Sequence, residues 1–139
     1  MVRFGDLNNR FTLSPKPMID AVTFKSAQLH GGFAIADVEL TDEPLVDAVG
    51  REAIARTRVV GRALSVTIRF GLSDKECSVT LYHEILEAMT VAVANPPASV
   101  MEFNEGDFER AGYEAFDQFG VASPESLNRM LQFYGFRER

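Results

Sequence analysis

The feature that most constrains the fold is a long, mostly apolar segment at residues 74–94, which predicts one central helix. Ser73 lies three positions before Glu76, and this spacing is a capping box that marks a helix start. The Pro96-Pro97 pair predicts where the helix ends, because proline cannot continue a helix. At about 100° per residue, apolar side chains cover more than half of this helix, so it should be largely buried. These side chains are Val79, Leu81, Tyr82, Ile85, Leu86, Ala88, Met89, Ala92 and Val93.

Three other segments predict a small sheet for this helix to cover. Residues 63–71 alternate apolar and polar side chains, which is the pattern of a half-buried strand. Residues 21–28 and 33–40 are predicted to be two further strands, joined as a hairpin through a pair of glycines. Simple alternation puts Ile35 and Val38 on opposite faces of the second strand.

Three further helices are predicted, at residues 41–58, at 105–119 and from 124 to about 135. The first of them depends on a proline in a favourable first-turn position and on a rough apolar stripe. That stripe consists of Val46, Val49, Ala53 and Ile54. The other two begin after side chains that can cap a helix, Asn104 and Ser123.

The fold class expected from these segments is α+β. A small antiparallel or mixed sheet packs on the long central helix, and the two C-terminal helices cover what remains. A chain of 139 residues fits one compact domain. We expect that domain to span residues 21–139, after an irregular N-terminal segment at residues 1–20.

Composition excludes several classes of function. A net charge of −6 disfavours nucleic acid as a partner, because phosphate binding needs clustered Lys and Arg. No apolar run is long enough to cross a membrane and no signal peptide is recognisable, so a cytoplasmic protein is expected. The single Cys77 excludes an internal disulfide and a cysteine-based zinc site, and we expect it to be a buried, unreactive thiol.

The predicted central helix carries one polar sector, formed by Thr80, His83, Glu84, Glu87 and Thr90. Residues four apart project from the same face of a helix, so His83 and Glu87 could reach a single metal ion or each other. A glutamate between two such ligands can point at a water molecule and take its proton. The sector therefore has either a structural or a chemical explanation.

The surrounding string, SVTLYHEILEAMT, resembles the active-site helix of small zincin-like metallopeptidases. Members of that family carry a pattern like T-L-x-H-E-x-x-H-A after an edge strand. The matching positions in this chain are Thr80, Leu81, His83, Glu84 and Ala88. The resemblance covers roughly residues 63–94.

What the resemblance implies is a zincin-like fold and a metal-dependent, peptidase-like hydrolase. His83 would be the first metal ligand, Glu84 the general base and Glu87 the second ligand. A peptide or protein partner would lie in a shallow cleft beside the strand at residues 63–70. Oligomeric state and substrate stay open.

Glu87 departs from the family pattern, since it stands where the second histidine is found. An additional negative ligand makes a metal ion less able to acidify water. No histidine follows His83, so any third ligand from the later segments must be an acid. The candidates are Glu102, Glu105, Asp107, Glu109 and Glu114. Such a set would hold zinc or a harder divalent cation.

Two alternative interpretations need no metal. In one, the chain is a non-catalytic binding or assembly module with a structural His83/Glu87 pair. In the other, an unrelated α+β domain exposes a polar helix strip to solvent. The acidic segment at residues 101–120 is expected to be a solvated helix face, with a cation or basic-partner site as the alternative. His30 is expected to be an exposed turn residue.

Overall fold

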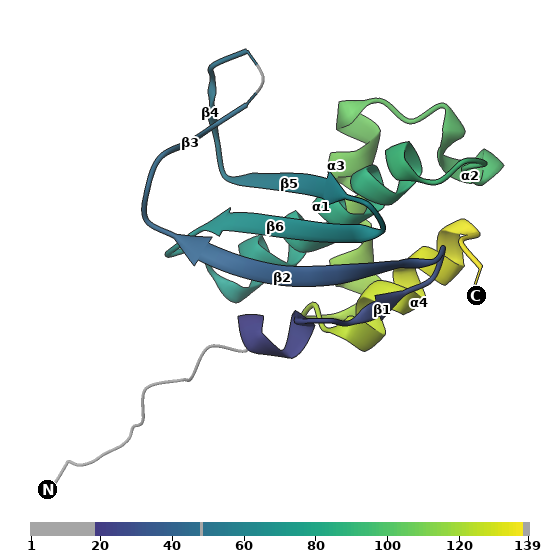
Figure 1. The fold of residues 1–139 in the computed structure, drawn as a ribbon, viewed down its shortest axis with the longest axis horizontal. Helices are drawn as coiled ribbons and strands as arrows, with labels where there is room; N and C mark the ends of the chain where they lie inside the picture. Colours follow the sequence, from purple (N-terminus) through teal and green to yellow (C-terminus); the bar gives the residue numbers. More distant parts are fainter. Residues whose placement is uncertain (1–18, 48, 138–139) are drawn as a thin grey trace, which may run out of the picture.

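A computed structural model describes residues 19–47 and 49–137 of the chain. Within them, four strands form one mixed sheet and the α-helices lie against one of its faces (Figure 1). The sheet has the order β1-β2-β6-β5, with β2 and β6 parallel and the other pairs antiparallel. Its strands are β1 (Gln28–Leu29), β2 (Phe33–Thr41), β5 (Ala55–Val60) and β6 (Ala63–Arg69). The helices are α1 (Asp74–Ala92), α2 (Ala98–Met101), α3 (Glu105–Phe119) and α4 (Pro124–Tyr134). The predicted α+β class is confirmed.

The strand predicted at residues 63–71 and the long central helix predicted at residues 74–94 are both confirmed, as β6 and α1. Leu64, Val66 and Ile68 of β6 are fully buried, as the alternation requires. The capping box at the start of α1 is present in full, with Ser73 and Glu76 bonding to each other's backbone N–H groups. These two elements supply much of the hydrophobic core, and for that reason their apolar patterns are the clearest in the sequence.

One detail of β2 differs from simple alternation. A register shift between Ile35 and Asp37 marks a β-bulge opposite β6. The extra residue places Val38 on the same buried face as Ile35, and not on the opposite face as predicted. The hairpin from β1 to β2 through the two glycines is confirmed.

The predicted strand at 21–28 is mostly wrong. Residues Ala21–Phe24 form a short 3-10 helix, η1, which Asp20 caps, and only Gln28–Leu29 pair as a strand. Phe24 is the buried residue of η1 and anchors that segment to the core.

The predicted helix at 41–58 is wrong. The segment forms a projecting two-stranded hairpin, β3 (Leu45–Val46) and β4 (Glu52–Ala53), and then enters β5 (Figure 1). Asp47 closes the hairpin turn by accepting hydrogen bonds from the N–H groups of Val49 and Arg51. The apolar stripe therefore had no core to face, and Val49 is 72% exposed.

The strand at the edge of the sheet is β5, while β6 lies inside it between β2 and β5. The cleft predicted beside residues 63–70 is therefore displaced by one strand, because β5 covers that side of β6. The predicted position of the cleft was wrong because β5 was not predicted as a strand.

The two C-terminal helices are confirmed as α3 and α4, with capping boxes at Asn104 and Ser123 and a left-handed Gly135 after α4. None of the helices in the described residues is long and apolar enough to cross a membrane. The irregular segment expected at residues 1–20 lies almost wholly outside the described residues, and the single domain at 21–139 stays a prediction.

Candidate metal centre

The polar sector of α1 lies on the flank that the sheet and the other helices leave partly uncovered. Leu81, Tyr82 and Ile85 are fully buried on the other sides of the helix. His83 and Glu87 are half-buried, with side chains that are 17% and 35% exposed. Thr80 of this sector is buried, whereas His83 and Glu87 face neither bulk water nor a sealed core, so they are held in place while remaining accessible.

His83 is the centre of a small cluster of acids. Its Nε2 atom lies 3.2 Å from Glu87 Oε1, one helical turn further along α1. The same nitrogen lies 2.9 Å from Oε2 of Glu105, the first residue of α3. One imidazole nitrogen therefore lies between carboxylates from two different helices.

Glu84 is held from the sheet side. The hydroxyl of Thr57, in the edge strand β5, donates a hydrogen bond of 2.7 Å to Glu84 Oε1. That contact leaves the second carboxylate oxygen without a hydrogen-bond partner in the described residues. The sequence does not identify Thr57, because the apolar pattern of the segment that contains it predicts a helix and not the strand β5.

Electrostatics in the cluster favour a charged imidazole and a charged Glu87. Burial opposes protonation of His83, but the hydrogen bond that Glu87 accepts and the charges of Glu84 and Glu105 outweigh it and raise the pKa of His83. The hydrogen bond from His83 lowers the pKa of Glu87. Partial burial and then the neighbouring Glu87 raise the pKa of Glu105, despite its mostly exposed side chain. The cluster thus gathers more negative charge than one imidazolium neutralises, and a divalent cation that replaced the proton on Nε2 would neutralise more of it.

Ligand atoms of His83, Glu84 and Glu87 all lie within 4.8 Å of one another, so the three residues could hold a metal ion. Ligands about 2.0–2.2 Å from an ion are roughly 3–3.5 Å from each other. The distances from His83 Nε2 to Glu87 and Glu105 fall close to that range. The donors are one imidazole and several carboxylates, a set that divalent cations accept.

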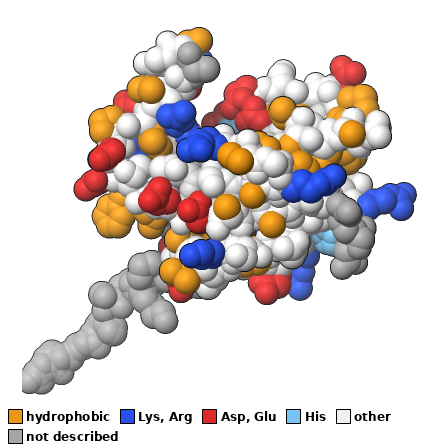
Figure 2. All heavy atoms as spheres, in the orientation of Figure 1, with side chains coloured by type: hydrophobic (Ala, Val, Ile, Leu, Met, Phe, Trp, Pro, Cys, Tyr) orange, Lys and Arg blue, Asp and Glu red, His pale blue; other side chains and the backbone are white. Residues whose placement is uncertain are grey.

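A pocket of about 230 Å3 lies beside the cluster, between β5 and α1. Its lining combines the acids with small apolar side chains: Thr57, Val59, Glu84, Glu87, Ala88 and Val91. Figure 2 shows acidic side chains gathered in a hollow between the projecting hairpin and the helices. A small molecule or a peptide side chain can reach the acids from this pocket.

Of the five acids considered as a third ligand, Glu105 is the one that the structure brings to His83. Asp107 is committed elsewhere, because its carboxylate caps the N-terminus of α3 and pairs with Arg110. No ion pair joins Glu102, Glu109 or Glu114 to His83 in the described residues. The distinction depends on how α3 packs on α1, which residue spacing does not reveal.

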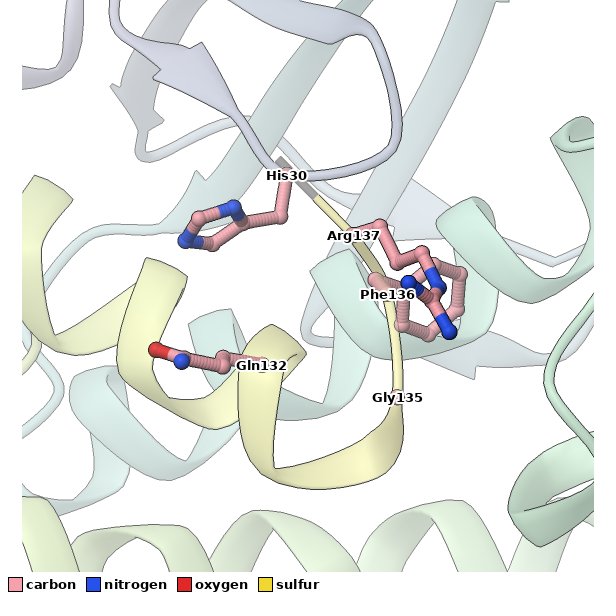
Figure 3. Close-up of a pocket in the computed structure, with 5 residues that line it drawn as sticks. All are labelled: His30, Gln132, Gly135, Phe136 and Arg137. Atoms are coloured by element: carbon pink, nitrogen blue, oxygen red, sulfur yellow. The ribbon is translucent and has the colours of Figure 1, made fainter. Parts of the chain in front are cut away.

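Cys77 and His30 lie apart from this cluster. Cys77 is buried as predicted, and burial raises its pKa to about 11, so the thiol stays protonated at neutral pH. His30 is half-buried and not exposed as predicted, because the turn that carries it packs against α4. It lines a separate pocket of about 450 Å3 with Gln132 and Arg137 (Figure 3). That pocket has no carboxylate in its lining, so it does not resemble a metal site.

The sequence-predicted residues His83, Glu84 and Glu87 thus come together, and the structure adds Glu105 and Thr57 to them. Comparisons with known protein families, curated proteins and solved structures found no match to this chain.

Proposed function

We propose that the protein is a metal-dependent, peptidase-like hydrolase that holds a divalent cation between His83, Glu87 and Glu105. The observation that supports this function best is the convergence of two carboxylates from different helices on one imidazole nitrogen. Structural polar pairs need one partner, whereas a metal site needs three or more donors around one point. The pocket beside the cluster supplies the access that a substrate needs.

The proposed ligand set has more carboxylates than histidines, so it suits manganese or ferrous iron as well as zinc. Carboxylate oxygen is a harder donor than imidazole nitrogen and is preferred by harder cations. A more anionic ligand set also leaves the ion a weaker Lewis acid. We therefore expect activity with manganese to equal or exceed activity with zinc.

In the proposed reaction a water molecule attacks the carbonyl carbon of an amide bond. A cation held by His83, Glu87 and Glu105 would polarise the carbonyl and lower the pKa of the water. Glu84 accepts the proton that the water loses as the C–O bond forms, and delivers it to the nitrogen as the C–N bond breaks. The hydroxyl of Thr57 holds one oxygen of Glu84, so that the other is directed to the proton.

The test of this function is the Glu84→Gln variant, assayed on a peptide library with added manganese or zinc. Glutamine keeps the size of the side chain but cannot take a proton, so turnover should fall by about 10²–10⁴-fold. The far-ultraviolet circular dichroism spectrum should stay unchanged, and the variant should still bind the cation through His83, Glu87 and Glu105. Equal turnover by the variant and the wild-type protein would reject Glu84 as the base.

A second candidate is a non-catalytic binding module, and one observation favours it. His83 already has acceptors in Glu87 and Glu105, so the cluster can be stable as a purely structural ion-pair network. This function requires that neither manganese nor zinc binds at His83 and that chelators leave partner binding unchanged. Metal-dependent turnover of any peptide would contradict it.

A further inference from the structure

The free edge of β5 presents backbone groups that no other strand covers. Arg69 N donates to Ile54 O, which makes Ile54 and Arg69 a hydrogen-bonded pair in the antiparallel ladder with β6. Because such pairs alternate along a ladder, the N–H and C=O groups of Thr57 and Val59 point away from β6. An extended chain could bond to these groups and become a fifth strand.

Side chains on the two faces of this edge differ in chemistry. Thr57 and Val59 face α1 and line the pocket beside Glu84. Arg56 and Arg58 lie on the opposite, open face of the sheet, where they border a hollow of about 310 Å3. Figure 2 shows Lys and Arg side chains gathered at the end of β5 next to the hairpin.

The two guanidinium groups have no carboxylate partner within the described residues. The nearest acids on that face, Asp37 and Glu39, belong to β2 and are separated from β5 by Ser65 and Thr67 of β6. The register aligns Glu39 with Arg56 and Asp37 with Arg58 across β6, so the backbones of each acid and arginine are two strand spacings, roughly 10 Å, apart. Arg56 and Arg58 occupy consecutive outward positions of an edge strand in a protein with a net charge of −6. Electrostatic complementarity at these positions favours an acidic partner.

We propose that the substrate is an extended peptide that pairs with β5 and carries acidic side chains at two positions separated by one residue. This inference rests on the proposed function for cleavage but not for binding. A peptide residue opposite Thr57 has its side chain over the pocket beside Glu84, because cross-strand neighbours share a face. The residues before and after it then lie opposite Arg56 and Arg58. The intervening residue faces Val59, Ala88 and Val91, so an apolar side chain fits there.

A second copy of this chain fits the same edge less well. Antiparallel pairing of two β5 strands about Thr57 would place Arg56 of one copy opposite Arg58 of the other. Like charges directly opposite each other destabilise a strand pair. Exposed charged side chains on an edge strand also protect proteins against such pairing.

The test uses full-length Glu84→Gln protein with manganese, so that binding is measured without cleavage. The probes are fluorescein-labelled peptides that alternate leucine with glutamate, glutamine or lysine. We expect the glutamate peptide to bind roughly tenfold more tightly than the lysine peptide. In the background of Arg56→Glu with Arg58→Glu, the preference should reverse.

The matched control is Lys25→Glu with Arg129→Glu, which changes the net charge by the same amount at exposed positions outside β5. It should retain the preference for the glutamate peptide. Equal binding of the glutamate and lysine peptides to Glu84→Gln protein, or equal loss in the two double variants, would overturn the inference. Charge-selective binding without any cleavage by the wild-type protein would reject the proposed function and keep the inference. Cleavage by the wild-type protein without charge-selective binding would keep the proposed function and overturn the inference.

Discussion

His83 connects the stability of the metal-free protein to pH. Burial opposes its protonation, but the hydrogen bond that Glu87 accepts and the charges of Glu84 and Glu105 raise its pKa above the usual 6.5. The folded state therefore holds this proton more tightly than the unfolded chain does. The resulting stabilisation is fully present below pH 6.5 and is lost as the pH rises through the folded-state pKa.

We expect the free energy of unfolding, measured in urea with a chelator present, to decrease as the pH rises from 6.5. In His83→Gln this decrease should be smaller, because the titrating group is gone. Glu87 acts at the acidic end, where its lowered pKa gives a stabilisation that is lost as the pH falls below 4.5. An unchanged slope above pH 6.5 in His83→Gln would show that another group is responsible.

Thr57 is the residue that distinguishes a positioned base from an ordinary surface glutamate. Thr57→Val keeps the shape of the side chain and removes the hydrogen bond to Glu84. We expect turnover to fall by roughly 10–100-fold, the usual cost of losing a partner that orients a group in a metal site. Metal affinity should stay the same, and Thr57→Ser should restore turnover. A loss of turnover in Thr57→Ser equal to that in Thr57→Val would argue against the hydroxyl.

Sequence reasoning located His83, Glu84 and Glu87 because helical spacing alone brings them to one face of α1. It could not choose Glu105 from five acids, since that contact joins residues 22 positions apart through the packing of α3 on α1. His30 is limited in the same way. The sequence predicts its position in a turn but not its partial burial, which depends on contact with α4.

At the scale of elements, the close approach of α3 to α1 keeps Glu105 within reach of His83. Gly112 permits this approach, because a Cβ atom there would lie 2.7 Å from the carbonyl oxygen of Val79 and 3.3 Å from His83 Cβ. The backbone oxygen cannot move aside without shifting the helix. Gly112 therefore supports the site although it carries no functional group.

Gly112→Ala should destabilise the fold by about 1–3 kcal/mol, the usual range for overpacking, and should weaken metal binding by separating α1 from α3. Gly106→Ala is the matched control in the same helix. A Cβ atom at Gly106 meets only the Asn104 side chain at 3.5 Å, so alanine should be neutral or stabilising by up to about 1 kcal/mol. The two variants can be compared by urea denaturation and manganese titration. Similar effects of the two variants on stability and on manganese affinity would show that Gly112 has no special role in the packing of α3 on α1.

The elements that the sequence predicted correctly have clear periodicity together with caps or turn glycines, and they are β2, β6, α1, α3 and α4. The error at residues 41–58 arose because a few apolar residues at helical spacing resemble a stripe even when no core faces them. Val49 and Ile54 are in fact exposed. A better signal was available in the alternation on both sides of Gly61-Arg62, the two-residue turn between β5 and β6. The β-bulge in β2 could not be inferred, because it depends on pairing with β6.

At the scale of the whole molecule, β5 and α1 border the hollow in which acidic side chains gather, between the projecting hairpin and the helices in Figure 2. The long central helix, predicted from sequence, is what places His83 and its neighbours there. The orientation of the hollow was not predictable, because it is set by β5 at the edge of the sheet. The proposed function therefore depends on a single property of this hollow, its ability to bind a divalent cation.

The most direct test is calorimetric titration of the metal-free protein with manganese and with zinc. We expect one ion to bind per chain, and Glu87→Gln and Glu105→Gln each to weaken binding by more than about 100-fold, since a ligand should matter more than an outer partner. Glu109→Gln, on the same helix as Glu105, should bind as the wild-type protein does. Absence of binding by the wild-type protein, or equal affinity in all four proteins, would contradict the metal centre.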